Sequence, residues 1–234
     1  MKRIHALSLV AALLAVTFPV HADDTAAAVA RWDASWAALK DCYNGCHSVI
    51  KKGGKVEDRT YRVWFKKPMN LRSEVVKGNR SGDNGSVAVW TGGDRVTGHQ
   101  GGILAGISLS LTLDNPKATS IRGGTIRDLQ FGRMLEVIHM WLNAKAKTTL
   151  TSGTVGGHAA TIITFTSDNK DFIAGNNNIA KDQFAYDNQV NLPLQWQSWE
   201  PDGTQAVDSS YYDIKVDIGV PDSAFQVKTR MTPP

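Results

Sequence analysis

Short stretches with a period of two, divided by turn residues, are the feature that most limits how this chain can fold. Gly53-Gly54 separates two such stretches, and Gly92-Gly93-Asp94 ends another. Alternating side chains place one face of a strand in a core, while glycine, asparagine and aspartate supply the turns of antiparallel hairpins. The pattern therefore predicts an antiparallel meander of short strands.

Strands are expected over residues 42–50, 61–65, 71–76, 87–90, 95–98, 148–155, 159–166, 184–187, 193–200 and 209–216. Between residues 104 and 113 the apolar side chains mix two periods, so strand and helix both stay open there. Asn176-Asn177-Asn178 is expected to be an exposed turn.

Two segments instead have helical spacing. Residues 24–40 place apolar side chains, Trp32 and Trp36 among them, at intervals of three and four. Residues 125–144 do the same, and Thr125 with Asp128 forms a capping-box pattern at their start. The expected fold class is thus mainly β with two helices.

The N-terminus has the pattern of a cleaved signal peptide, predicted as residues 1–22. Lys2 and Arg3 precede an apolar run over residues 7–16, and Val20-His21-Ala22 ends in a small residue. The run is shorter than the roughly 20 residues that span a bilayer; a buried N-terminal helix is the alternative. Residues 23–234 show no internal repeat or long linker, so they are expected to be one exported, periplasmic domain.

Composition and motif spacing argue against several function classes. The formal net charge is +4 and includes Lys2 and Arg3, and the remaining basic residues are scattered, so no nucleic-acid partner is expected. The histidines of the predicted domain fall on four different predicted elements and match no metal-binding spacing; they are His47, His99, His139 and His158. No Gly-x-Ser-x-Gly motif occurs. The chain is expected to be no enzyme and to hold no metal or other cofactor.

The two cysteines are the sharpest local feature. The stretch from Cys42 through Cys46 to His47 resembles the haem-attachment motif of c-type cytochromes, with one extra residue between the cysteines. Covalent haem is not favoured, because the segment opens a sheet rather than a small helical wrapper. A Cys42–Cys46 disulfide across the Asn44-Gly45 turn is the favoured interpretation in an oxidising compartment. A helix permits a bridge between positions four apart, whereas a straight strand forbids it.

Residues 61–72, with Lys67-Pro68 between two strand-like stretches, resemble a segment of the LolA-like periplasmic lipoprotein and lipid carriers. The order of helices and strands is similar throughout residues 23–234, including Trp90-Thr91-Gly92-Gly93-Asp94 and a closing pair of strands after Pro193. The run around Arg122-Gly123-Gly124 looks closer to an uncharacterised branch of that superfamily. The resemblance implies a strongly curved antiparallel sheet, an incomplete barrel, with helices packed on its concave face.

The resemblance also implies an apolar cavity for acyl chains, placed between the sheet and the helices. Its expected lining is Trp32, Trp36, Trp64, Phe65, Trp90, Met134, Ile138 and Trp141. Lys67 stands where these carriers have an arginine that latches a lid by hydrogen bonds to backbone carbonyls; lysine keeps the charge but lacks the planar fork of donors. A solvated strand residue is the alternative for Lys67.

The function expected from the resemblance is a non-enzymatic carrier or chaperone for a lipid, lipoprotein acyl chains or a similar hydrophobic molecule. A membrane-bound donor or acceptor protein is a further expected partner. The alternative is a structural or sensory interaction protein on the same fold, whose cavity is filled by its own side chains and which transports no ligand.

The signal-peptide hypothesis predicts that the exported protein begins at Asp23, because signal peptidase cleaves after a small residue such as Ala22. N-terminal sequencing of the protein recovered from the periplasm checks this. Recovery there with Met1 intact would contradict the predicted cleavage.

Overall fold

The computed structural model describes residues 22–234 of the chain, and most of the predicted signal peptide lies outside this range. In chain order the elements are α1 (Ala22–Ala38), β1 (Asp41–Lys52), β2 (Lys55–Lys66), β3 (Asn70–Gly78), β4 (Val87–Trp90), β5 (Arg95–His99), η1 (Gly102–Gly106), β6 (Leu109–Thr112), η2 (Ile126–Leu129), α2 (Phe131–Asn143), β7 (Lys147–Val155), β8 (His158–Thr166), α3 (Lys170–Gly175), β9 (Lys181–Asp187), β10 (Pro193–Trp199), β11 (Gln205–Val216) and η3 (Asp222–Phe225).

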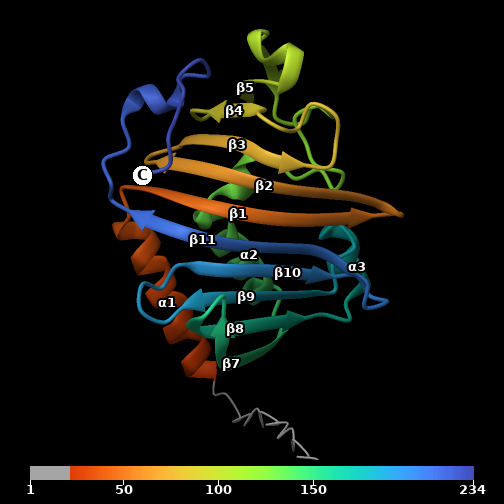
Figure 1. Cartoon of the computed structure of the whole chain (residues 1–234). Coiled ribbons are helices and arrows are strands. Elements are labelled where there is room, and N and C mark those ends of the chain that lie inside the picture. The colour runs from red at the N-terminus through yellow and green to blue at the C-terminus, as the bar shows by residue number, and fades with distance from the viewer. Residues whose placement is uncertain (1–21) are drawn as a thin grey trace, which may run out of the picture.

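All the strands belong to one antiparallel sheet of 11 strands, in the order β6-β5-β4-β3-β2-β1-β11-β10-β9-β8-β7 (Figure 1). Two meanders, β1 to β6 and β7 to β11, meet where β1 pairs with β11. The sheet is open, with β6 and β7 at its two edges. The predicted fold class, a curved antiparallel sheet that forms an incomplete barrel, is confirmed.

The connection between β6 and β7 determines how the concave face is covered. These strands are consecutive in sequence but lie at opposite edges of the sheet. The chain between them, residues 113–146, must therefore cross the whole sheet. Its first half is irregular apart from η2, and its second half is α2.

Helices α1 and α2 lie on the same face of the sheet and pack mainly over its C-terminal half, although Trp36 of α1 also reaches Phe65 of β2 (Figure 1). Aromatic rings join the helices to the sheet: Trp32 of α1 stacks on Tyr186 of β9, with 4.0 Å between the ring centroids. Trp141 of α2 stacks on Phe165 of β8 at 6.0 Å. Such pairs add to the free energy gained by burial, so this half of the concave face is a filled core.

The helix predictions are confirmed with changed boundaries. The first helix runs from Ala22 to Ala38. The second predicted helix is split, because Gln130 is extended (φ −92°, ψ 142°) between η2 and α2. The predicted capping box is present, since Asp128 Oδ2 accepts a hydrogen bond from Thr125 N (2.6 Å) and Thr125 Oγ1 accepts from Arg127 N (3.2 Å). The undecided segment after β5 contains η1 and then β6.

Helix α3 was not expected from the sequence. It is capped by Asn169, whose side chain accepts hydrogen bonds from Asp171 N and Phe172 N. The asparagine turn follows this helix directly.

The C-terminal segment covers the convex face of the N-terminal half of the sheet (Figure 1). Arg72 of β3 is almost fully buried there and donates hydrogen bonds to the carbonyl oxygens of Ala224, Gln226 and Thr229. Glu74 pairs with the same guanidinium at 2.6 Å. A buried arginine requires such partners, so Arg72 fixes the path of the last residues over the sheet.

Asp182 of β9 joins helix α2 to the sheet. Its carboxylate is buried and accepts hydrogen bonds from Trp141 Nε1 (2.6 Å), Trp196 Nε1 (3.1 Å) and Ser198 Oγ (2.5 Å). Burial away from water raises the pKa of this carboxyl group, and the three donors oppose that rise. The group thus ties one side chain of α2 to two of β10.

Replacement of Asp182 by asparagine is expected to destabilise the fold, because the amide NH2 cannot accept the donors that the second carboxylate oxygen accepts. An unsatisfied buried donor costs about 1–3 kcal/mol of the free energy of unfolding. Urea unfolding at neutral pH checks this. Asp208→Asn, at a half-buried position of β11, is the matched control and should stay within about 0.5 kcal/mol of the wild type; equal stability of both variants would contradict the role of Asp182.

The same variant tests the pH dependence. Because burial raises the folded-state pKa of Asp182 above its ordinary value, the stabilising contribution of its protonation is present below that ordinary value and is lost as the pH rises through the folded-state pKa. The Asp182→Asn variant should lose this part of the pH dependence.

Candidate ligand cavity

A cavity of about 690 Å³ lies mainly over the N-terminal half of the sheet and reaches β9, β10 and β11 at the border of the filled core. Strands β1 to β6, together with parts of β9, β10 and β11, form its floor, and residues 117–129 of the crossing segment form its roof. The roof is defined here as these residues. The cavity exists because α2 covers only the C-terminal half, and the irregular first half of the crossing segment does not fill the space beneath it.

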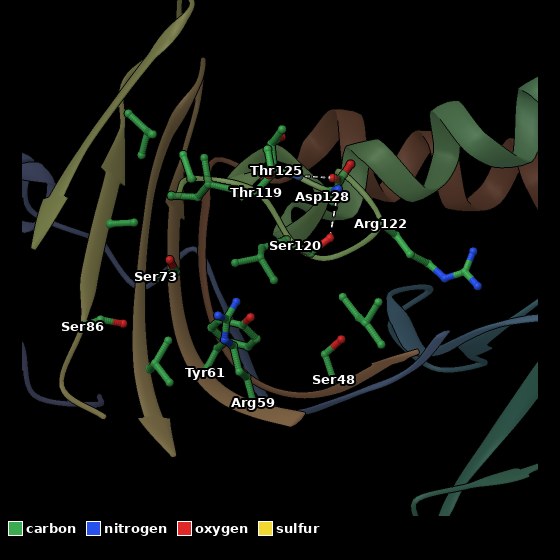
Figure 2. Close-up of a pocket in the computed structure, with 18 of the residues that line it drawn as sticks. Ser48, Arg59, Tyr61, Ser73, Ser86, Thr119, Ser120, Arg122, Thr125 and Asp128 are labelled. Atoms are coloured by element: carbon green, nitrogen blue, oxygen red, sulfur yellow. Dashed lines mark hydrogen bonds between the residues drawn. The ribbon is translucent and has the colours of Figure 1, made fainter. Parts of the chain in front are cut away.

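Hydroxyl groups and apolar side chains share this cavity. Figure 2 shows Ser48, Tyr61 and Ser73 on the curved floor strands, opposite Thr119 and Ser120 of the roof. Burial raises the pKa of Tyr61 to about 12, so its phenol stays protonated and can donate a hydrogen bond. The apolar part of the lining consists mainly of Ile50, Val75, Ala88, Val96, Leu111, Ala118, Ile126, Leu129, Val137, Ile179 and Val207. Such a lining suits a molecule with a long apolar part and some polar atoms.

The charged groups on the floor are paired with one another. Arg59 Nε lies 3.1 Å from Asp83 Oδ2, and Arg59 Nη2 lies 3.0 Å from Asp83 Oδ1 and 3.4 Å from Glu57 Oε1. Glu57 also pairs with Arg80. Two guanidinium groups thus face two carboxylates, so this cluster carries no formal net charge.

The roof is held to the rest of the molecule at two adjacent residues. Ile121 N donates a hydrogen bond to Glu57 Oε2 (3.0 Å). Arg122, almost fully buried, donates to the carbonyl oxygens of Lys51 (2.6 Å) and Asn177 (3.1 Å) and pairs with Glu200. In Figure 2 the Arg122 side chain points away from the cavity. These contacts tie the roof to both meanders of the sheet.

None of the eight side chains predicted to line the cavity does so. Six are buried in the main core: Trp32, Phe65, Trp90, Met134, Ile138 and Trp141. Trp36 packs against that core, 4.9 Å from Phe65 between ring centroids. Trp32, Trp36 and Trp141 of the helices pack directly on Tyr186, Phe65 and Phe165 of the sheet, so these rings are enclosed between helix and sheet.

Trp64 is on the opposite face of the sheet from the expected one. It packs on Tyr43 under the C-terminal segment, with 5.2 Å between the ring centroids. Neighbouring residues of a strand face opposite sides, so Phe65 and Trp64 could not both have lined one cavity.

Lys67 makes the kind of contact that the family resemblance implied. Its Nζ donates hydrogen bonds to the carbonyl oxygens of Trp36 and Ala37, both at 2.7 Å, and lies 5.2 Å from the centre of the Trp36 ring. These carbonyls end helix α1, where a cation is favoured by the helix dipole. Lys67 is therefore not simply solvated; its action as a lid latch stays a prediction.

The expected Cys42–Cys46 disulfide is wrong in this structure, where both thiols are free and buried. Helix α1 ends at Ala38 and β1 begins at Asp41, so both cysteines lie within a strand. Positions four apart in a strand are roughly 13 Å apart, too far for a bridge. Burial raises the pKa of each thiol to about 12.

The cysteines and the histidine of the haem-type motif do not face one common site either. His47 follows Cys46 in β1 and so faces the other side of the sheet, where its Nε2 lies 2.9 Å from Asp58 Oδ1. The buried thiols face the core instead. This donor set does not fit a covalently attached haem.

The other histidines lie apart from one another. His139 is within 3.0 Å of Asp33, His158 is 2.9 Å from Asp187, and His99 contacts the carbonyl of Gln100. Among residues 22–234, no three side chains of histidine, cysteine, aspartate or glutamate are grouped as metal ligands. Within the same residues no helix has both the length and the apolar character needed to span a membrane.

Comparison with solved structures shows likeness of fold. An uncharacterised conserved protein from Thermus thermophilus matches with a TM-score of 0.54 and 12% identity, over 89% of this chain and 94% of that one. MucB matches at 0.55 and 14%, over 88% and 63% of the two chains. The lipoprotein LppX of Mycobacterium tuberculosis matches at 0.52 and 11%, over 86% and 99%. No family model matches the sequence, and no curated protein does. The fold is thus similar to those of MucB and LppX, and its open sheet with helices on one face is the architecture that the sequence resemblance implied.

The free thiols predict a specific labelling pattern. In the native protein at pH 8, alkylation of Cys42 and Cys46 should be very slow, because both thiols are buried and protonated. In denaturant without reductant, both should be alkylated, which intact-mass measurement detects. If the mass shows no alkylation until reductant is added, the disulfide hypothesis would be supported instead.

Proposed function

We propose that this protein is a non-enzymatic binding protein of the periplasm that carries or chaperones a molecule with a long apolar part, such as a lipid or the acyl chains of a lipoprotein. The observation that carries the proposal is the cavity of about 690 Å³ between the floor strands and the roof. Sites for single small molecules have volumes of about 300–1,000 Å³. The apolar walls would hold the ligand by removing its surface from water.

The polar part of the lining limits which kinds of ligand would fit. The serine hydroxyls and the Tyr61 phenol supply hydrogen bonds, while the floor arginines are neutralised by Glu57 and Asp83. An amphipathic molecule whose polar atoms accept hydrogen bonds suits this surface. In this proposal a membrane-bound donor or acceptor protein delivers or receives the ligand.

The LolA-like fold supports the proposal through the likeness to lipoprotein LppX, although that likeness concerns the fold alone. The competing hypothesis is an interaction protein without a ligand. It draws on the same structure, because the C-terminal half of the concave face is filled by α1 and α2. Binding measurements separate the two.

A tryptophan placed in the cavity should block binding. Ala88 of β4 lines the cavity, so Ala88→Trp puts an indole where the ligand would lie and should weaken binding of a fluorescent fatty acid at least about tenfold, or ~1.4 kcal/mol. Ala159→Trp, on the exposed surface of β8, is the matched control and should bind like the wild type. Melting curves of both variants establish that they are folded.

The proposal fails if the wild type shows no saturable binding and native mass spectrometry finds no lipid in the purified protein. That result would favour the interaction protein. Equal binding by the wild type and a folded Ala88→Trp variant would indicate that the ligand binds at another site.

A further inference from the structure

The tip of the hairpin formed by β5 and β6 is an exposed apolar surface that the ligand-binding proposal does not use. We define the apolar tip as Ile103, Leu104, Ile107 and Leu109. Ile103 is fully exposed (101%), and the other three are exposed by 46–58%. None of the residues of η1 is buried. In Figure 1 this yellow-green helix projects beyond β5, away from the body of the sheet.

The apolar tip has no charged side chain of its own. From Gln100 to Leu113 the sequence contains no aspartate, glutamate, lysine or arginine. Along the hairpin, Asp94, Arg95 and Asp114 lie at the opposite end, since Arg95 pairs with Thr112 and Gly98 with Leu109. Nearby Asp83 and Arg80 are engaged with Arg59 and Glu57. Exposed apolar groups that gather without charges mark an interaction site more often than a solvated surface.

The apolar tip is continuous with the cavity. Leu104, Ile107 and Leu109 belong to the tip and also line the cavity, so these side chains connect the apolar lining to the exposed tip. Whatever covers the tip therefore also faces the mouth of the cavity.

We propose that the apolar tip docks this protein on the surface of a lipid bilayer, with Ile103 inserted among the lipids. A bilayer needs only a few apolar side chains at one point, each gaining free energy as its surface leaves water. A protein partner would need roughly 800 Å² of complementary surface on each side and polar groups to set its orientation; the tip is a single five-residue 3₁₀ turn and offers neither. Docking goes beyond the proposed function, since it does not require a bound ligand.

The proposal predicts how binding responds to charge and salt. Because the tip is uncharged and the charged residues of the hairpin lie at its other end, association should occur with vesicles of phosphatidylcholine alone. It should also persist at high salt, which weakens only electrostatic attraction between exposed groups. Binding confined to anionic vesicles at low salt would overturn docking through the apolar tip.

Substitution of Ile103 tests the tip directly. Ile103→Asp should lower the partition coefficient of the protein onto phosphatidylcholine vesicles by about tenfold or more. Co-sedimentation with the vesicles measures this coefficient. Ile103 is fully exposed, so the variant should fold normally. Val190→Asp changes an exposed valine of the β9–β10 turn (51% exposed) and should bind like the wild type. All variants share one N-terminus, so a difference between them belongs to the substituted position.

A second measurement locates the contact. Ile103→Cys, labelled with an environment-sensitive dye, should show a blue shift on addition of the vesicles, whereas labelled Val190→Cys should not. The natural thiols stay unlabelled in the folded protein because they are buried. No vesicle binding by the wild type, or equal binding by Ile103→Asp, would overturn the proposal. Concentration-dependent dimerisation that Ile103→Asp abolishes, without vesicle binding, would assign the tip to a second copy of the chain.

The two proposals fail separately. If Ile103→Asp loses vesicle binding but still binds fluorescent fatty acid, docking and ligand binding are both supported. If the wild type docks on vesicles but binds no fatty acid, the carrier function fails and docking stands.

Discussion

The path of the chain between the two edge strands is the constraint on which the rest of this structure depends. Because β6 and β7 lie at opposite edges, residues 113–146 have to cross the concave face of the sheet. The helical half of this segment brings a stripe of apolar side chains that packs tightly on strands. The irregular half has no such stripe, so it bridges the floor strands instead of filling the space above them. One connection thus produces a filled core on one side and a cavity on the other.

The two halves of the face are stabilised by different interactions. Stacked rings and the Asp182 hydrogen bonds secure α2 over the C-terminal meander. The roof is held mainly by polar contacts, those of Arg122 and of Glu57. Buried ion pairs contribute little net stability, because desolvation offsets most of their attraction, but breaking one partner away is costly. These polar contacts therefore fix the position of the roof but add little to the free energy of unfolding.

Local periodicity was sufficient to predict most strands, both main helices and the capping box at Thr125. It could not predict which strands neighbour each other, because β1–β11 pairing joins residues far apart in sequence. The predicted cavity lies under the helices, whereas the cavity in the structure lies beside them, and none of the eight predicted side chains lines it. The expected Asn44-Gly45 turn is likewise absent: β1 runs as one strand from Asp41 to Lys52, which places Cys42 and Cys46 too far apart for a bridge. Trp64 lies on the convex face, because a difference of one residue along a strand changes the face to which a side chain points. The contacts of Lys67 with backbone carbonyls follow from the resemblance of its segment to a known family and not from hydrophobic periodicity.

The contacts of the roof also bear on how a ligand would enter. To lift the roof, the chain would have to expose the buried Arg122 guanidinium and leave two carbonyls and Glu200 without their partner, which is costly in a buried site. At the β5–β6 side the cavity is bordered by an edge strand, whose outer side has no neighbouring strand, and by half-exposed leucine and isoleucine side chains that can move without breaking hydrogen bonds. Side-chain rotation is far less costly than separation of a buried ion pair. The exchange of an apolar ligand is therefore expected on that side, where the apolar lining reaches the surface.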